Sequence, residues 1–365
     1  MKAKRIKAER LFARLRKTWV DWRGTSGQIY FEQRVKEYRE MWVAVAEELG
    51  ARFSTLADGF WELDVDGRSL RIHNYQLEFD DPVTLSLAGN KPLVHRLLNE
   101  RDIPTPKHLV FRLAELENAY GFLAENPKYC VIKPADSYGG KGVSTHVENP
   151  REVKRAAILA SLYSPDLLME KQVPGESYRL LILGGRMVHA VCRRGPRLVG
   201  DGRLTVGALI ERENSRLREK GERGFALDRD CAFTLGYQGL ELASTPEKGR
   251  EFLVKSIDDP ARNGQEVRTV YNEVVTHLIC GEIRAQAELA ARIVRSDFVG
   301  VDIITVDPRI PLAASGGVVN EVNTTPALHH HYDLAGEKYP QVALQAAAYL
   351  LNGGWEVESE RACAS

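Results

Sequence analysis

Two carboxylates and one amide lie in a pair of apolar segments near the end of the chain. Segment 298–306 has strong β character, and Asp302 is its one acidic residue. The next predicted strand carries Glu321 and Asn323, which share a face because side chains i and i+2 of a strand do; Val319 is expected on that face too. If the two strands pair, the carboxylates and the amide converge, and such hard oxygen ligands suit Mg²⁺. The solvent-facing side of an edge hairpin is the alternative explanation.

A glycine-rich segment follows a predicted buried strand at 129–132. Three glycines within four positions make a loop whose N–H groups can approach an anion closely, and two lysines nearby can neutralise phosphate charge. The segment is neither a Walker A loop nor a dinucleotide fingerprint, because its residues do not match either pattern. A plain surface turn remains the alternative. The residues concerned are Lys133, Ser137, Gly139, Gly140, Lys141 and Gly142.

The helices and strands that position these residues are predicted from the spacing of apolar residues and from the glycines and prolines that end each element. A helix is predicted up to Gly50, and two short strands are predicted on either side of the Asp66–Gly67 turn. A further helix at 90–101 ends at the proline pair of 103–106, which is the strongest linker signal in the chain. Strands and helices alternate beyond it as far as about residue 300, which favours a mixed α/β architecture.

Composition excludes several classes of protein. Fifty basic residues balance fifty acidic ones, so no overall field points to nucleic acid. Five dispersed cysteines without a C-x-x-C pair argue against a disulfide framework and favour a reducing, cytoplasmic location. No apolar stretch is long enough to span a membrane, and the basic N-terminus lacks the apolar region of a secretory signal.

The N-terminal 18 residues hold eight Lys or Arg and one acid, Glu9. Apolar residues from Ile6 to Trp22 recur at helical spacing, which predicts a basic amphipathic helix. We expect its apolar stripe to dock on the protein itself. A contact in a homo-oligomer, a membrane surface and an anionic partner are the alternatives.

Seven ordered segments carry a resemblance to a known family. They are Asn90–Lys91 with 103–106, then 131–134 with the glycine loop, 168–175, 177–185, Arg193–Arg194 with 199–202, 300–302 and 321–326. In this order they resemble the ATP-grasp superfamily, most closely the ATP-grasp module of cyanophycin synthetases and of glutathione-synthetase-like ligases. The resemblance runs from about Leu87 to Asp333.

The resemblance implies an ATP-grasp fold, of mixed α/β class, and an ADP-forming carboxylate–amine ligase that makes a peptide or amide bond through an acylphosphate. ATP and Mg²⁺ are the implied cofactors, with two ions and with Mn²⁺ as a substitute. Amino acids or small peptides are the implied substrates. The implied units are an N-terminal helical and α/β domain at 1–88, a linker helix and lid subdomain at 89–176, a catalytic subdomain at 177–354 and a frayed tail at 355–365.

The resemblance also assigns residues. Asp302, Glu321 and Asn323 would hold the metal ions, Lys91 and Lys133 would contact the α- and β-phosphates, and the glycine loop would cover the γ-phosphate. Glu170, Lys171 and Val173 would surround adenine, and Glu176 lies where ribose contacts are made. Arg179 and Arg194 would hold the substrate carboxylate or the transferring phosphoryl group. A salt bridge in the central sheet is the alternative for each arginine. Arg193, Arg194, Asn323 and His331 would line the substrate site.

Three departures separate the chain from the family pattern. Ser177 replaces the acid that suits ribose hydroxyls, and 252–264 is not the asparagine- and glycine-rich substrate stretch of cyanophycin synthetases. The chain ends soon after the match, so we expect no Mur-ligase-like module and no cyanophycin product.

His329, His330 and His331 are consecutive, so they cannot face one metal ion on a helix or strand. A nucleotide-binding regulatory or scaffold protein and a small-molecule kinase remain alternative functions.

Overall fold

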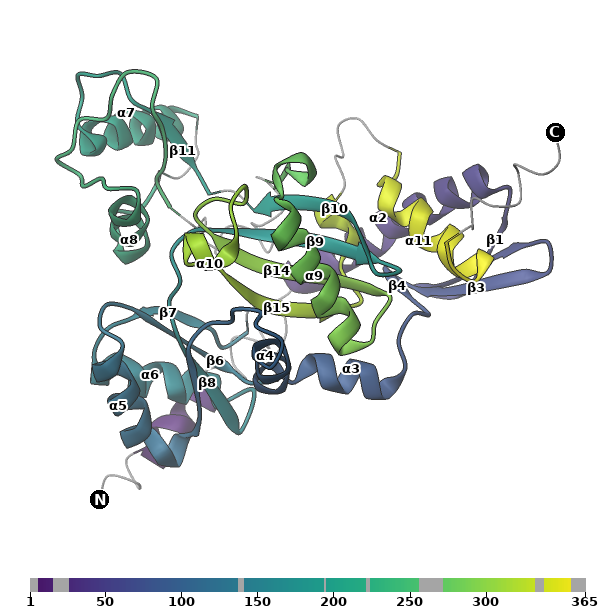
Figure 1. Cartoon of the computed structure of the whole chain (residues 1–365), viewed down its shortest axis with the longest axis horizontal. Helices are drawn as coiled ribbons and strands as arrows, with labels where there is room; N and C mark the ends of the chain where they lie inside the picture. The colour runs from purple at the N-terminus through teal and green to yellow at the C-terminus, as the bar shows by residue number, and fades with distance from the viewer. Residues whose placement is uncertain are drawn as a thin grey trace.

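The structure is a computed structural model that describes residues 6–15, 26–136, 141–193, 195–220, 224–255, 272–331 and 338–355. Within these ranges the strands form four sheets, and every strand pairing is antiparallel. Helices pack on the three larger sheets, as Figure 1 shows, so the predicted mixed α/β class is confirmed.

A five-stranded sheet, the central sheet, lies in the middle of the molecule (Figure 1). Its order is β13-β10-β9-β14-β15. The strands are β9 (Glu176–Leu183), β10 (Arg186–Arg193), β13 (Asn272–Val274), β14 (Phe298–Thr305) and β15 (Val318–Thr324).

Both faces of the central sheet are covered, which explains why its strands are nearly continuous apolar runs. Leu180 and Ile182 of β9 face a core formed with α9 (Gly281–Val294) and α4 (Lys91–Asn99). Leu181 and Leu183 face the opposite core, which includes α2 (Ser26–Leu49) and α11 (Gln341–Asn352). The predicted strands at 298–306 and 317–323 are therefore confirmed as neighbours in one sheet.

The N-terminal sheet has the order β1-β2-β3-β4 and shares its core with α2 and α11. Its strands are β1 (Arg52–Ala57), β2 (Phe60–Val65), β3 (Arg68–His73) and β4 (Gln76–Leu77). The β2–β3 turn is the predicted one, since Asp66 and Gly67 both have positive φ, of 52° and 75°. The sequence analysis missed β1, the edge strand.

A second lobe, the lid lobe (residues 108–171), carries the sheet β5-β8-β6-β7. Its elements are β5 (His108–Arg112), α5 (Leu116–Glu125), β6 (Cys130–Pro134), β7 (Ser144–Val147), α6 (Pro150–Ala160) and β8 (Asp166–Lys171). Both helices pack on one face of the sheet to form a separate apolar core. Two helices, α3 (Pro82–Gly89) and α4, lead into it; Val94 and Leu98 of α4 belong to the central core.

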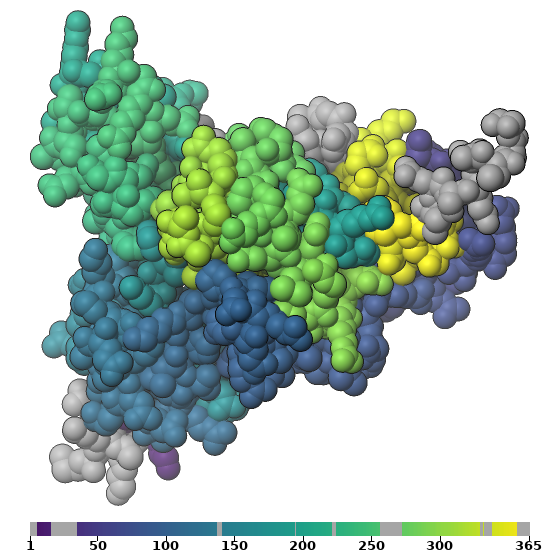
Figure 2. All heavy atoms as spheres, viewed as in Figure 1, coloured from purple at the N-terminus to yellow at the C-terminus, as the bar shows by residue number. Residues whose placement is uncertain are grey.

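A third unit, the inserted unit (residues 195–255), comprises β11 (Arg197–Val199), α7 (Val206–Glu219), α8 (Arg229–Tyr237) and β12 (Glu251–Leu253), with a small core of its own. Its helix α7 is rich in charged residues at positions 211–219. Figure 2 shows this unit in teal and green above the blue lid lobe. The two meet where Arg229 bonds Glu152 of α6 at 2.7 Å. The remaining short elements are η1 (Leu113–Glu115), η3 (Thr276–Leu278), α10 (Leu312–Ser315) and η4 (Leu328–His331).

Two expectations about the chain ends are wrong. The tail does not begin at residue 355, because Trp355 packs against the core that includes α2 and α11. Its Nε1 also donates to the Gly184 carbonyl at 3.1 Å. The N-terminal helix, seen at residues 6–15, contacts the lid lobe rather than the unit at 26–88. Most of the described part of its apolar stripe is not docked: Ile6 packs beside the lid core, but Leu11, Phe12 and Leu15 are all more than half exposed. Trp19 and Trp22 lie outside the described residues. No described helix is long and apolar enough to cross a membrane.

Candidate active site

Buried charge identifies the site. Seven Lys, Arg, Asp and Glu side chains are buried among the described residues, although such side chains are almost never fully buried unless paired. Six of the seven are residues that the sequence analysis assigned to the site: Lys91, Lys133, Glu170, Arg179, Arg193 and Asp302. They come from the central sheet, from α4 and from the lid lobe, so the tertiary fold brings together residues that are far apart in the sequence.

Asp302 is the centre of the group. It lies on β14 opposite Arg179 of β9 and Glu321 of β15. Arg179 donates to both of its carboxylate oxygens at 2.7 Å, Asn323 Nδ2 donates to Oδ2 at 3.2 Å, and Arg193 Nη2 lies 3.7 Å from Oδ1. The predicted convergence of the two carboxylates and the amide is confirmed. The salt bridge that was the alternative for Arg179 is also present.

Gly300 makes room for this pairing. A Cβ atom at Gly300 would lie 3.3 Å from both Cδ and Nε of Arg179 and 3.4 Å from Pro326. Most Cβ contacts are longer, so a Cβ at this position makes the arginine side chain shift. Glycine two residues before the aspartate therefore lets Arg179 lie across β14 and reach Asp302.

A β-bulge changes one part of the predicted face. Asp302 pairs with Glu321 but Ile303 pairs with Val319, so Asn320 is an extra residue in β15. Val319 consequently turns into the central core beside Val322, and the expectation that it shares a face with Glu321 is wrong. The bulge also directs the Asn320 carbonyl to His95, whose Nε2 lies 2.9 Å away.

The two predicted phosphate lysines both form ion pairs across the site. Lys91, the first residue of α4, places Nζ 3.1 Å from Glu321 Oε1. Lys133, on β6, places Nζ 2.8 Å from Glu170 Oε2. Lys91 is thus held by a carboxylate next to Asp302, and Lys133 is held by a carboxylate of the lid sheet.

His95 is a site residue that the sequence analysis missed. It follows Lys91 by one helical turn, so both lie on the same face of α4, and this spacing was the available signal. Burial lowers the pKa of His95, which is therefore neutral near pH 7. Its Nε2–H donates to Asn320, which leaves Nδ1 as an acceptor 3.9 Å from Glu170 Oε1. Neither atom has a hydrogen-bond donor among the described residues.

The predicted adenine hinge follows β8. Lys171 N donates to Lys107 at 2.9 Å and Gln172 N donates to Tyr129 at 3.0 Å, so both amides serve the lid lobe itself. In the described part of the chain, Val173 N has no backbone acceptor. Gly175, with φ of 124°, would place a Cβ 2.3 Å from the Thr305 carbonyl carbon, so only glycine allows the hinge to pass β14 this closely.

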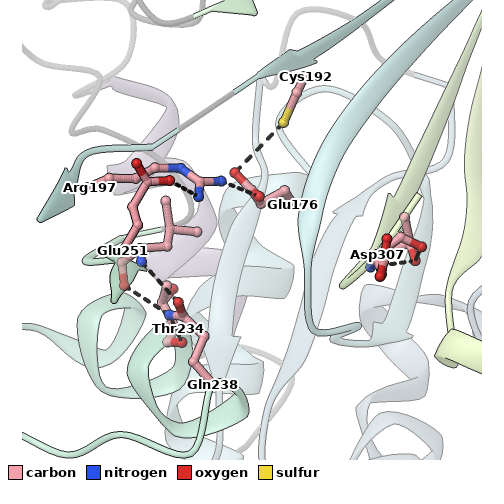
Figure 3. A network of polar contacts seen from close by, with 9 residues as sticks. Glu176, Cys192, Arg197, Thr234, Gln238, Glu251 and Asp307 are labelled. Carbon is pink, nitrogen blue, oxygen red and sulfur yellow. Dashed lines mark hydrogen bonds and ion pairs between the residues drawn. The ribbon is translucent and has the colours of Figure 1, made fainter. Parts of the chain in front are cut away.

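Glu176 begins β9 and is paired with the inserted unit (Figure 3). Its carboxylate accepts from Arg197 Nη2, and Arg197 Nη1 bonds Glu251 at 2.7 Å. Cys192 Sγ lies 3.7 Å from the other Glu176 oxygen. Arg197 was not assigned to the site from sequence, because a lone arginine after a glycine and a proline gives no spacing signal. Through it, Glu176 and the inserted unit are joined.

The predicted substrate residue His331 is buried in η4 and lies against β10. Its Nδ1 is 2.9 Å from Nδ1 of His189, so one of the two rings donates a proton to the other. Burial lowers the pKa of His189. His189, which the sequence analysis did not assign to the site, is thus paired with this histidine.

Several predicted residues lie outside the described part of the chain, namely Ser137, Gly139, Gly140 and Arg194, together with the side chains of His329 and His330. The end of the glycine loop is described. A Cβ on Gly142, whose φ is 75°, would lie 2.7 Å from Tyr163, so this position also requires glycine. Lys141 beside it is exposed. Among the described residues, no three His, Cys, Asp or Glu side chains form a metal cluster, so the predicted site relies on the amide of Asn323.

The buried charges between a lid lobe and a central sheet are the arrangement that the resemblance to ATP-grasp ligases implies. Comparison with known proteins identifies relatives of that kind. The chain is 28% identical over 344 residues to cyanophycin synthetase from Nostoc sp., across 89% of this chain and 37% of that protein. It is 25% identical over 259 residues to the glutathione biosynthesis bifunctional protein GshAB from Clostridium perfringens, across 69% of this chain and 32% of that protein.

These relatives confirm the resemblance that the motifs predicted, and the chain spans about a third of their length. No family model matches the chain. Among solved structures, a bifunctional glutathione synthetase from Pasteurella multocida aligns with 83% of this chain and 41% of its own, at 21% identity and a TM-score of 0.48.

Proposed function

We propose that this protein is an ATP-dependent carboxylate–amine ligase that forms a peptide or amide bond and releases ADP and phosphate. The observation that carries the proposal is the group of buried charges around Asp302. Four basic side chains (Lys91, Lys133, Arg179 and Arg193) meet three carboxylates (Glu170, Asp302 and Glu321) in ion pairs that cross from one element to another.

The donor set fits Mg²⁺ and a polyphosphate. Asp302 and Glu321 are adjacent carboxylates, and the nitrogen of Asn323 is committed to Asp302, which leaves its oxygen as the atom for a cation. Bound phosphates would attract Lys91 and Lys133, while a metal ion would attract the carboxylates that now hold them. The existing ion pairs keep these groups in place and compensate most of their charge until both components bind. Two Mg²⁺ ions, with Mn²⁺ as a substitute, are part of the proposal.

The hinge side fits adenine. Glu170 Oε1 and His95 Nδ1 are buried acceptors that face each other across 3.9 Å, and no described residue donates to either atom. An exocyclic amine can donate to such a pair, whereas a carbonyl oxygen at the same position would repel it. Val173 N, which lacks a backbone acceptor in the described part of the chain, can donate to a ring nitrogen. These groups favour ATP over GTP.

The chemistry follows from positioning and charge. A carboxylate oxygen of the acyl donor attacks the γ-phosphorus, the bond from that phosphorus to the bridging oxygen breaks, and ADP leaves. The amine nitrogen then attacks the acyl carbon, loses a proton, and phosphate leaves. Bound Mg²⁺ would neutralise charge that develops on the phosphoryl oxygens. Arg179 and Arg193, held beside Asp302, offer guanidinium groups to the anionic donor or to the transferring phosphoryl group.

The substrates are an anionic carboxylate donor and an amino acid or small peptide as acceptor, since basic side chains dominate the site. Arg194 and His331 are proposed to line this part of the site. The four described cysteines form no disulfide with one another, in keeping with the proposed cytoplasmic location.

The test mixes purified protein with ATP, Mg²⁺ and pools of amino acids, and measures released phosphate together with new masses by mass spectrometry. Glu321→Gln should reduce product formation at least about 100-fold, because a metal ligand loses its charge. Glu62→Gln is a matched control: Glu62 also pairs with a basic side chain at 3.1 Å and is 20% exposed, against 25% for Glu321, but it lies in the N-terminal sheet.

Equal amounts of ADP, phosphate and a condensed product, lost in Glu321→Gln and retained in Glu62→Gln, support the ligase. ATP binding without turnover across all pools would contradict it and indicate a regulatory nucleotide-binding protein. A phosphorylated product without condensation would contradict it in favour of a kinase.

A further inference from the structure

The N-terminal helix (residues 6–15) is attached to the lid lobe by one narrow face. Ile6 packs beside the lid core, Glu9 pairs with Lys154 of α6 at 2.6 Å, and Arg10 donates to the Ser161 carbonyl at 2.8 Å. Ile6, Glu9 and Ala13, spaced by three and four residues, are the partly buried positions of the helix. The attachment is therefore polar for the most part and leaves the rest of the helix at the surface.

The opposite face of the helix is apolar and uncovered. Leu11, Phe12 and Leu15 are 60%, 72% and 62% exposed, and with Ala8 they form one stripe along the helix. Three large apolar side chains on one exposed helical face are unusual for a surface that only water contacts. In Figure 1 the helix lies at the outer end of the lid lobe, on the opposite side of the molecule from α11.

Basic side chains border the stripe. Lys7 and Arg14 are exposed and lie two helical turns apart on the same flank, with Arg10 between them. The whole chain has equal numbers of basic and acidic residues, so this local excess does not reflect a basic protein. An apolar stripe bordered by cations is complementary to a binding partner whose outer layer is anionic and whose interior is apolar.

We propose that this helix binds the surface of an anionic lipid bilayer. Leu11, Phe12 and Leu15 would enter the boundary between headgroups and acyl chains, and Lys7 and Arg14 would contact lipid phosphates. A second copy of the chain fits less well, because two such helices packed face to face would bring the same basic flanks together. The proposal is independent of the ligase activity.

The test is co-sedimentation of the full chain with vesicles of phosphatidylcholine, with and without about 40 mol% phosphatidylglycerol, at low salt and in about 0.5 M NaCl. We expect binding only to the anionic vesicles, with at least about tenfold weaker partitioning at high salt. Phe12→Ser with Leu15→Ser should reduce partitioning at least about tenfold, as should Lys7→Gln with Arg14→Gln.

Val83→Ser is the matched control, because Val83 is 75% exposed on α3, which lacks a basic flank. Unchanged melting temperature and ATP turnover in the helix variants would show that the lid lobe is intact. Failure of the native protein to bind anionic vesicles, or binding that the Phe12 and Leu15 substitutions leave unchanged, would overturn the proposal. A concentration-dependent dimer that the same substitutions abolish, without lipid binding, would assign the helix to a second copy instead.

Discussion

The pair between Arg179 and Asp302 makes a quantitative prediction. Asp302 is 5% exposed and accepts two bonds of 2.7 Å from Arg179, with Arg193 also within 3.7 Å. Asp302→Asn keeps the shape but offers one acceptor oxygen where two are used, and it leaves two buried guanidinium groups without their carboxylate. Breaking a buried pair in this way costs about 3–5 kcal/mol. We therefore expect the melting temperature to fall on the order of 5–10 °C.

Two further variants separate this explanation from a general loss of packing. The double variant Asp302→Asn with Arg179→Gln should melt no lower than Asp302→Asn alone, because it also removes one of the uncompensated charges. Asp166→Asn is the matched control: it removes a carboxylate from another cross-strand pair, with Arg112 at 2.8 Å, but that pair is exposed to solvent. Its melting temperature should stay close to that of the native protein.

The measurement is differential scanning calorimetry of the full chain, with urea unfolding as a second probe. Equal losses for Asp302→Asn and Asp166→Asn would refute the argument that burial determines the cost. Additive losses in the double variant would refute the argument that the unpaired guanidinium group is the cause.

Three other predictions follow from the same contacts. Gly300→Ala should lower kcat/KM about tenfold with little loss of stability, because the new Cβ shifts the side chain of Arg179 slightly without breaking its pair with Asp302. Steady-state kinetics and calorimetry together check this, and unchanged kinetics would contradict it. Burial lowers the pKa of His95, so the unfolded chain binds a proton that the folded chain does not, and the free energy of unfolding should fall as the pH drops below 6.5. In urea titrations, His95→Gln should make the free energy of unfolding less dependent on pH. An unchanged dependence would exclude His95 as its source. Burial raises the pKa of Cys130 and of Cys231 to about 11, so in the folded protein both thiols should resist alkylation at about pH 8 that modifies the unfolded chain; rapid labelling of either would show that its core opens.

Local pattern predicted the strands and the pairings that short-range chemistry determines. The Asp66–Gly67 turn joins two strands of alternating residues, and both of its residues adopt the left-handed conformation that such a turn requires. Asp302 and Glu321 were expected on facing strands and are direct register partners. In each case the information lies within a few residues, where side-chain alternation and turn preference are sufficient.

Features that depend on distant partners escaped the sequence. The bulge at Asn320 reversed the direction of Val319, because one extra residue changes the face of every side chain before it. His95 entered the site through its bond to the Asn320 carbonyl, and Arg197 did so through Glu176. Periodicity within α4 places His95 on the same face as Lys91, but it does not show which distant group either His95 or Arg197 contacts.

The sequence by itself determined which residues can do chemistry here: the carboxylates and amide in apolar strands, the lysines at α4 and β6, and the glycines that leave space for neighbouring groups. Only the tertiary structure decided how they are paired. Arg179 and Asp302 are 123 residues apart in the sequence, and Lys91 of α4 forms an ion pair with Glu321 of β15. A buried charge is stable only beside its partner, so the partner is known only once the sheets and α4 have packed together.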